Sequence, residues 1–139
     1  MAPTEAEVHV YASAREFVVV PVTMTDTGAV LEVMPVERVK LVVGRATTVA
    51  LSVALRQMHL RSTGELSATR WDADNGRWWE HSLLFVVLQW QPDELVFARQ
   101  ELDSCGEWQT MSIERLSTST SFSTLAEKLV HALGEQLDR

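Results

Sequence analysis

The sequence is poor in cysteine, and its single thiol, Cys105, excludes an internal disulfide. Such a chain suits a reducing compartment. Because neither a C-x-x-C partner nor a neighbouring base accompanies Cys105, we interpret it as an ordinary turn residue. The longest apolar run, residues 83–88, is far shorter than the ~20 residues that a membrane-spanning helix needs. No segment near the N-terminus resembles a secretory signal, so we expect a cytoplasmic protein that does not cross a membrane.

Motifs for catalysis or cofactor binding are missing as well. The sequence contains no G-x-G-x-x-G, P-loop, G-x-S-x-G or H-E-x-x-H pattern. Residues 72–76 superficially resemble a calcium loop, but the EF-hand pattern needs Asp or Asn where Gly76 stands and Gly where Arg77 stands. The histidines are too widely spaced to predict a zinc site: His9, His59, His81 and His131. We therefore expect no metal, no cofactor and no enzymatic activity.

Basic residues are scarce relative to acidic ones. The chain carries 19 acidic and 12 basic residues, for a net charge of -7. The segment from Glu65 to Glu107 holds nine of the acids but only three arginines, and all five tryptophans lie in this segment or touch its end. An acidic surface repels the phosphates of nucleic acid, so a nucleic-acid partner is excluded. The same surface attracts a basic protein partner.

Length and composition indicate one globular domain. The 139 residues are 46% hydrophobic and 22% charged, which is typical of a chain that buries a core without disulfides. We expect residues 1–7 to form a flexible tail and residues 8–139 to form a single domain. The oligomeric state is not defined by the sequence.

The first third of the chain alternates with period two and predicts a β-meander. Thr25 to Gly28 supplies turn chemistry between two of the strands. Pro21 withholds a hydrogen bond from its strand, which predicts a sheet edge or a bulge at that position. The predicted strands cover residues 8–11, 17–24, 29–34 and 36–43.

A helix is predicted over residues 47–61, where the apolar period changes to that of a helix. Leu51, Ala54, Leu55 and Met58 form its expected core stripe, which Val49, Val53 and Leu60 are expected to widen. Thr47 or Thr48 can cap the start, and Gly64 lies just beyond the end.

Four further strands are expected after this helix, at residues 66–71, 77–90, 95–102 and 108–116. Turn residues separate them at 74–76, 91–94 and 103–106. Residues 83–88 are apolar on both faces and are therefore assigned to the centre of the sheet. A last helix, at about 124–138, is predicted to begin with a capping box formed by Thr124 and Glu127. The predicted fold is α+β: an antiparallel sheet of meander hairpins packed with two helices, at about 47–61 and 124–138.

The stretch RWDADNGRWWE, residues 70–80, suggests a binding surface. In a strand, Trp78 and Glu80 share one face and Trp79 the other, so one indole can enter the core while another is exposed beside acids. Exposed tryptophan among carboxylates is typical of a hot spot for a cationic partner, although both rings can equally cover the sheet. Successive turns of a meander alternate ends, so only some of the candidates can touch one partner. The candidate partner-binding residues are Trp71, Asp72, Asp74, Trp78, Glu80, Asp93, Glu94, Asp103 and Glu107.

The N-terminal part of the chain resembles small immunity proteins encoded beside polymorphic bacterial toxins, including contact-dependent growth-inhibition systems. The resemblance covers about residues 8–60 and rests on Val8-His9-Val10-Tyr11, on residues 17–21, on a Thr-Gly turn and on residues 32–36. It implies a cytoplasmic inhibitor that binds the C-terminal toxin domain of its cognate effector, commonly a basic nuclease. The acids would then mimic the phosphates that the toxin otherwise binds. The resemblance transfers no binding residues position by position.

Two other classes of function stay open. One is a small-ligand-binding or regulatory domain, formed as a dimer if an exposed strand of the N-terminal hairpin pairs across subunits. The other is a small hydrolase acting through aspartate or histidine. An immunity gene should follow the gene of a large secreted toxin, whereas the gene of a regulator should not.

Overall fold

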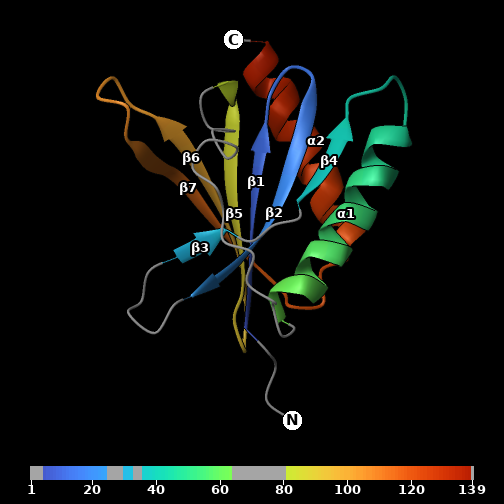
Figure 1. The fold of residues 1–139 in the computed structure, drawn as a ribbon, viewed down its shortest axis with the longest axis vertical. Coiled ribbons are helices and arrows are strands. Elements are labelled where there is room, and N and C mark those ends of the chain that lie inside the picture. Colours follow the sequence, from blue (N-terminus) through green and yellow to red (C-terminus); the bar gives the residue numbers. More distant parts are fainter. Residues whose placement is uncertain (1–4, 25–29, 33–35, 64–80, 139) are drawn as a thin grey trace.

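The fold was analysed in a computed structural model that describes residues 5–24, 30–32, 36–63 and 81–138. These residues contain seven strands and two helices (Figure 1). They are β1 (Ala6–Ala12), β2 (Glu16–Met24), β3 (Val30–Glu32), β4 (Glu37–Lys40), α1 (Ala46–Thr63), β5 (Leu84–Trp90), β6 (Leu95–Leu102), β7 (Trp108–Leu116) and α2 (Phe122–Leu137).

All seven strands belong to one antiparallel sheet. Six of them follow the order β3-β2-β1-β5-β6-β7, and β4 pairs with β2 beside β3. Val10 of β1 lies opposite Val19 of β2 on one side and Val86 of β5 on the other. Because β5 lies between β1 and β6, the prediction that residues 83–88 run through the centre of the sheet is confirmed for β5. The predicted α+β class is confirmed too.

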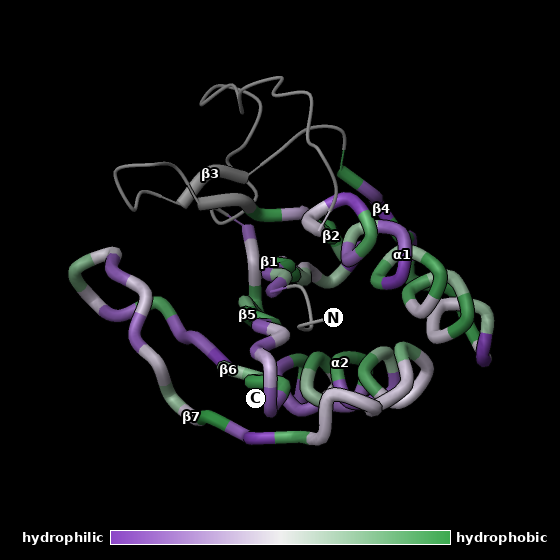
Figure 2. Tube along the Cα trace, turned by 90° about the horizontal axis from the view of Figure 1, so that it is seen from below, coloured by the Kyte–Doolittle hydropathy of each residue, from purple (hydrophilic) through white to green (hydrophobic). Residues whose placement is uncertain are grey.

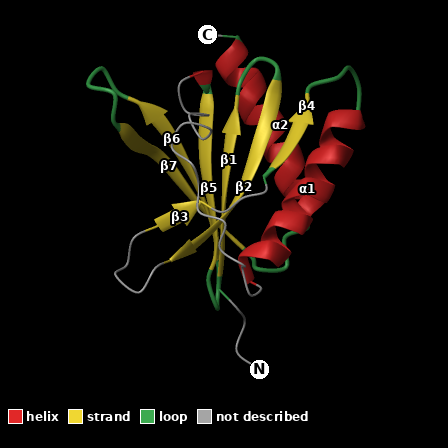
Figure 3. Ribbon diagram, viewed as in Figure 1, coloured by secondary structure: helices red, strands yellow, loops and turns green. Residues whose placement is uncertain are grey.

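Both helices cover the same face of the sheet (Figures 2 and 3). α1 contacts β1, β2 and β4, and α2 contacts β5 and α1. Alternation along the strands sends every second side chain toward the helices, and these side chains form the main core. Fully buried members of the core include Val8, Val10, Phe17, Val19, Leu51, Leu55, Leu84, Val86, Leu88, Leu95, Leu125 and Leu129.

The face of the sheet opposite the helices carries a second, smaller apolar cluster. Tyr11 of β1 stacks on Phe85 of β5 with ring centroids 4.5 Å apart, and Trp108 of β7 lies 5.2 Å from the same Phe85 ring. Val18 and Val20 of β2 are buried in this cluster. One edge strand thus contributes a tryptophan that reaches toward the sheet centre.

Helix α1 confirms part of the predicted stripe and corrects the rest. Leu51, Ala54, Leu55 and Met58 are buried as expected, whereas the three residues expected to widen the stripe are exposed: Val49, Val53 and Leu60. The predicted threonine cap is wrong, because α1 begins at Ala46 and Thr47 lies inside its first turn. The buried Thr47 hydroxyl instead donates to the carbonyl of Val42 and accepts from its N–H.

Helix α2 begins earlier than predicted. Ser121 is its N-cap, and the Ser121 hydroxyl accepts the backbone N–H of Thr124 at 3.1 Å. The capping box of Thr124 and Glu127 is therefore wrong. Thr124 already lies inside the first turn of the helix. Its backbone N–H is one of the groups that need a cap, so its side chain cannot be the cap. Helical spacing in the sequence predicts an apolar stripe of Leu125, Leu129, Leu133 and Leu137. The first three are buried as expected, whereas the prediction is wrong for Leu137, which is exposed at the end of the helix.

Several strand boundaries also differ from the prediction. β1 begins at Ala6, so the expected tail loses its last two residues to the sheet. β4 ends at Lys40 rather than at residue 43, since the chain turns through Gly44 at a φ of +88°. β5 begins at Leu84, and residues 81–83 are not strand. The strand expected at 66–71, the start of the one expected at 77–90, and Gly64 lie outside the described residues.

Pro21 lies inside β2, yet the edge that it predicted exists locally. On the side of β2 away from β1, pairing with β4 stops at Val19 and pairing with β3 starts at Val22. Pro21 therefore has a paired strand residue, Val8, on the β1 side alone. A residue without an N–H donor is accommodated at the gap between two short strands.

Candidate partner-binding surface

Five of the nine predicted partner-binding residues lie outside the described residues: Trp71, Asp72, Asp74, Trp78 and Glu80. The other four lie in two turns, with Asp93 and Glu94 before β6 and with Asp103 and Glu107 after it. The eight residues of β6 separate these turns by about 26 Å at ~3.3 Å per residue. The two acidic pairs therefore do not form one surface.

The turn between β5 and β6 uses one of its acids inside the fold. The N–H of Gln91 donates to the carbonyl of Glu94 at 2.8 Å and closes the predicted turn. The Glu94 carboxylate forms an ion pair with Arg115 of β7. Asp93 is exposed. Glu94 is therefore less available to a partner than its sequence position suggested.

The turn between β6 and β7 is built around Asp103. One carboxylate oxygen of Asp103 accepts the N–H groups of Cys105 and Glu107, each at 2.9 Å, and the other accepts the amide of Gln109 at 2.9 Å. The N–H of Glu107, followed by the amide of Gln109, lowers the pKa of Asp103 below its usual value. Gly106 takes a φ of +82°, which suits glycine. Asp103 thus fixes the turn and keeps its negative charge there.

The hairpin of β6 and β7 presents an acidic and apolar surface that projects away from both helices (Figure 2). No basic residue occurs from Gln100 to Ile113, whereas three acids do: Glu101, Asp103 and Glu107. Glu107 is exposed, whereas Glu101 is half-buried and accepts a hydrogen bond from Gln136 of α2. Three large apolar side chains of the same hairpin are exposed, namely Leu102, Met111 and Ile113. Residues 109–115 of β7 are all exposed, and in the described sheet β7 is the terminal strand of the order. We call residues 100–113 the acidic hairpin.

The apolar part of the acidic hairpin was not predicted from the sequence. Met111 and Ile113 belong to β7, which was predicted only as a strand over residues 108–116. Ser112 pairs with Arg99 and Thr110 with Gln100, so Met111 is an extra residue in β7, at a β-bulge. The exposure of Met111 and Ile113 is a property of the tertiary structure, in which residues 109–115 of β7 are not covered.

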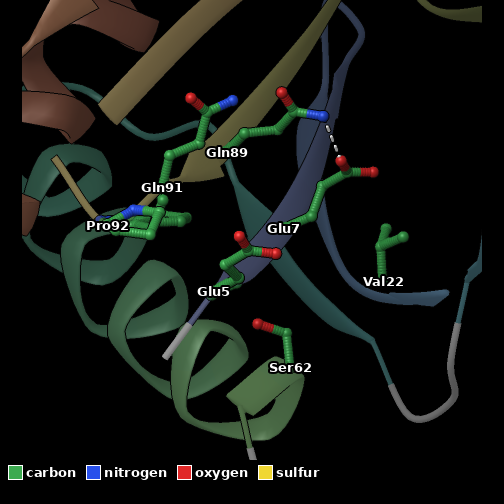
Figure 4. Close-up of a pocket in the computed structure, with 9 residues that line it drawn as sticks. Glu5, Glu7, Val22, Ser62, Gln89, Gln91 and Pro92 are labelled. Carbon is green, nitrogen blue, oxygen red and sulfur yellow. Dashed lines mark hydrogen bonds between the residues drawn. The ribbon is translucent and has the colours of Figure 1, made fainter. Parts of the chain in front are cut away.

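A pocket of about 470 Å³ opens where the start of β1, the β5–β6 turn and the end of α1 meet (Figure 4). Glu7 faces it and accepts a hydrogen bond from Gln89, while His9 lies 2.8 Å from the same carboxylate. Burial opposes ionisation of Glu7, but the hydrogen bonds from His9 and Gln89 outweigh it and lower the pKa. Glu5 adds a second carboxylate, and Ser62 of α1 a hydroxyl.

Other candidate chemistry is sparse. In the part of the chain that the structure describes, no group of three or more His, Cys, Asp or Glu side chains is arranged to hold a metal ion. Cys105 is exposed in the β6–β7 turn, where a turn residue was predicted. Among the described residues, no helix has the length and apolar character required to cross a membrane.

The fold places the chain among α+β proteins with one antiparallel sheet covered by two helices on a single face. No family model matches the sequence, and no curated protein matches it either. Among solved structures, the chain is similar to the protein of unknown function NMB0488 from Neisseria meningitidis. The TM-score is 0.66, and the similarity covers 97% of each chain at 12% sequence identity. At this identity the similarity establishes the fold alone.

Proposed function

We propose that this protein is a bacterial immunity protein that acts in the cytoplasm by binding a basic toxin domain and occluding it. The observation that carries the proposal is the acidic hairpin, which combines three acids, no base and three exposed apolar side chains on a projecting edge. The resemblance of residues 8–60 to immunity proteins points the same way. Inhibition by occlusion requires no catalytic group.

Charged and apolar residues of the acidic hairpin would have different roles in binding. Exposed carboxylates raise the association rate of a basic partner by electrostatic steering, an effect that falls with ionic strength. Leu102, Met111 and Ile113 supply apolar area at the centre of the contact, where most binding energy is found. Asp103 holds the turn in one conformation through three hydrogen bonds, so little ordering is needed on binding.

The test uses the toxin domain encoded immediately upstream of this gene. We expect co-expression with this protein to restore growth and the two chains to form a stable complex. The double variant Glu107→Lys/Ile113→Glu should weaken the complex by about a hundredfold. The first substitution reverses the charge of an exposed acid, and the second places a carboxylate in the apolar centre of the contact, where it would be desolvated. Both side chains are exposed, so neither substitution removes a side chain from the core.

The matched control is Glu127→Lys, which reverses an exposed charge on α2, outside the hairpin. It should leave the affinity within about threefold of the wild type. Equal affinity of the wild type and the double variant would rule out the acidic hairpin as the binding surface. Absence of toxicity, or rescue without a complex, would rule out the immunity function itself.

A second candidate function, binding of a small cationic ligand, is favoured by the pocket beside Glu7. Its volume of about 470 Å³ falls within the usual range of ligand pockets, and its lining contains two carboxylates and no basic side chain. The protein would then be a ligand-binding or regulatory domain. Rescue from a toxin does not follow from this function, so the co-expression experiment separates the two candidates.

A further inference from the structure

The other edge of the sheet, at β4, has backbone groups that point outward. The N–H of Leu41 donates to the carbonyl of Arg15 at 2.9 Å, which makes this a hydrogen-bonded pair. In an antiparallel ladder, hydrogen-bonded and non-hydrogen-bonded pairs alternate. The register of β4 and β2 therefore makes Arg38 and Lys40 non-hydrogen-bonded toward β2. Their N–H and C=O groups face away from β2, toward the side of β4 on which no other strand pairs among the described residues.

A groove lies directly beside this edge, between β4 and α1. It has a volume of about 450 Å³, and its lining includes Val39, Val42, Ala46, Ala50 and Val53. Ala46, Ala50 and Val53 lie on one side of α1, since they are spaced by four and three residues. Apolar side chains continue outside the groove, where Val43 is fully exposed and Val49 is 62% exposed. The β4 edge and the groove together resemble the sites at which proteins bind an extended peptide. In such sites the peptide adds a strand to the sheet, and alternate side chains of the peptide enter pockets.

The charge of this region is opposite to that of the whole chain. Residues 36–63, which contain β4 and α1, carry five basic residues and one acid, Glu37, within a protein of net charge -7. Arg38 and Lys40 themselves are exposed. Glu16 of β2 lies opposite Lys40 and forms an ion pair with Arg38, which leaves one positive charge in excess on these three residues. The edge of β4 therefore favours acidic side chains on an added strand.

The same charges oppose a second copy of β4 at this edge. The outward hydrogen-bonding positions of β4 are Arg38 and Lys40, so every antiparallel pairing of β4 with its copy sets a cation opposite a cation. Like charges directly opposite each other across a sheet are destabilising, and basic residues on an edge are a known protection against self-pairing. The β7 edge of another copy fits poorly too, because β7 contains a single acid, Glu114.

We propose that the groove between β4 and α1 binds an extended protein segment in which acidic residues alternate with apolar ones. The segment adds to the sheet beside β4. Its acidic side chains lie opposite Arg38 and Lys40, on the face of the sheet away from the helices, because opposite residues share a face. Its apolar side chains point to the other face, into the groove beside Val53 of α1.

This surface is separate from the acidic hairpin, and its partner has the opposite charge. β4 and β7 lie on opposite sides of the sheet (Figure 1). The proposal does not depend on the immunity function, because it rests on the pairing pattern, the groove and the charge of residues 36–63.

The test measures binding of a synthetic ten-residue peptide of alternating glutamate and valine, by NMR titration of the full chain. We expect saturable binding, with shifts of backbone amides at residues 37–42 and 46–57. Val53→Glu should weaken binding about tenfold or more, because it places a carboxylate in the apolar groove. Lys40→Pro should weaken it about fivefold relative to Lys40→Ala, because it removes one outward N–H while an edge strand tolerates proline.

The controls separate this site from other modes of binding. A lysine-and-valine peptide of the same length should bind at least about tenfold more weakly. Ile113→Glu, on the opposite edge of the sheet, should leave the peptide affinity unchanged. The proposal is overturned if the peptide does not saturate at millimolar concentration, if Val53→Glu binds as the wild type does, or if the shifts fall on β7. It is also overturned if the chain alone forms a dimer in solution whose amide shifts map to the same groove.

Discussion

The two halves of the molecule share one sheet and one helical layer, yet they present different chemistry to solvent. Residues 1–63, which contain β1 to β4 and α1, carry six acidic and six basic residues, and residues 81–139, which contain β5 to β7 and α2, carry nine acids and four bases. The edge of the first half is short, basic and adjacent to an apolar helix surface. The edge of the second half is a nine-residue strand beside an acidic turn.

This difference shows that the fold is compatible with two distinct interaction surfaces. The buried layer is similar in both halves, since valine and leucine from the strands meet leucine from the helices. The exposed residues are free to differ because they contribute little to stability. Charge therefore separates the surfaces: the acidic hairpin selects a basic partner, and the β4 edge selects an acidic one.

The largest expected effect distinguishes the buried and exposed sides of α1. Leu55→Ala should lower the free energy of unfolding by about 2–5 kcal/mol, because Leu55 is fully buried and the substitution leaves a cavity. Val53→Ala, two residues away, should change it by less than about 0.5 kcal/mol, because Val53 is exposed. Urea unfolding of both variants measures the difference. If Val53→Ala lowered the unfolding free energy as much as Leu55→Ala, Val53 would belong to the core. It would then not be available to line an exposed groove beside β4.

An intermediate effect compares the starts of the two helices. Thr47→Val should cost about 1–3 kcal/mol, because it leaves the N–H and carbonyl of Val42 without their buried partner. Ser121→Ala should cost about 1 kcal/mol through loss of the α2 N-cap. Ser123→Ala, at an exposed position of the same first turn, is the control. Thermal unfolding measures both losses of stability. A larger loss for Ser121→Ala than for Thr47→Val would contradict the role given to the buried Thr47 hydroxyl.

The smallest effect concerns the seam between the halves, where His59 of α1 packs edge-on against Trp90 of β5 and Phe122 of α2, with centroids 4.6 and 5.5 Å away. Burial lowers the pKa of His59. The unfolded chain then binds a proton more readily than the folded one, so stability is lost as pH falls from about 6.5 through the lower folded pKa.

Unfolding free energies at several pH values between 5 and 8, for the wild type and for His59→Gln, test this coupling. The variant should show a shallower fall of stability toward acid pH. Glu7 and Asp103 also have lowered pKa values and contribute in both proteins, but their effects appear at lower pH, where carboxylates titrate. Identical pH slopes in the two proteins would mean that His59 is hydrated in the folded state.

Much of the fold was predictable because strand alternation and turn residues are local signals. The predicted strands at 95–102 and 108–116 coincide with β6 and β7, and the turns at 91–94 and 103–106 lie where expected. The helix caps were not predictable with the same accuracy. Thr47, Thr48, Ser121 and Thr124 are all chemically able to cap, and the choice depends on where the chain leaves the sheet.

The candidate site was predictable only in part. The sequence indicated an acidic surface and located its turns, but it could not separate Asp103, which builds a turn, or Glu94, which pairs with Arg115, from acids that are free to bind a partner. It also assigned Val53 to the core stripe of its helix, although Val53 is exposed. That exposure depends on which strands α1 covers.

The sequence by itself determined the antiparallel α+β fold, the central residues of the core stripe of each helix and the concentration of negative charge after residue 63, because periodicity and charge are local properties of the chain. Only the tertiary structure decided that the two acidic turns lie at opposite ends of β6, and that β3 and β4 form one edge of the described sheet while β7 forms the other. It also decided which apolar residues remain exposed. Those features follow from strand order and from the placement of two helices on one face, and both are set by contacts between residues far apart in the sequence.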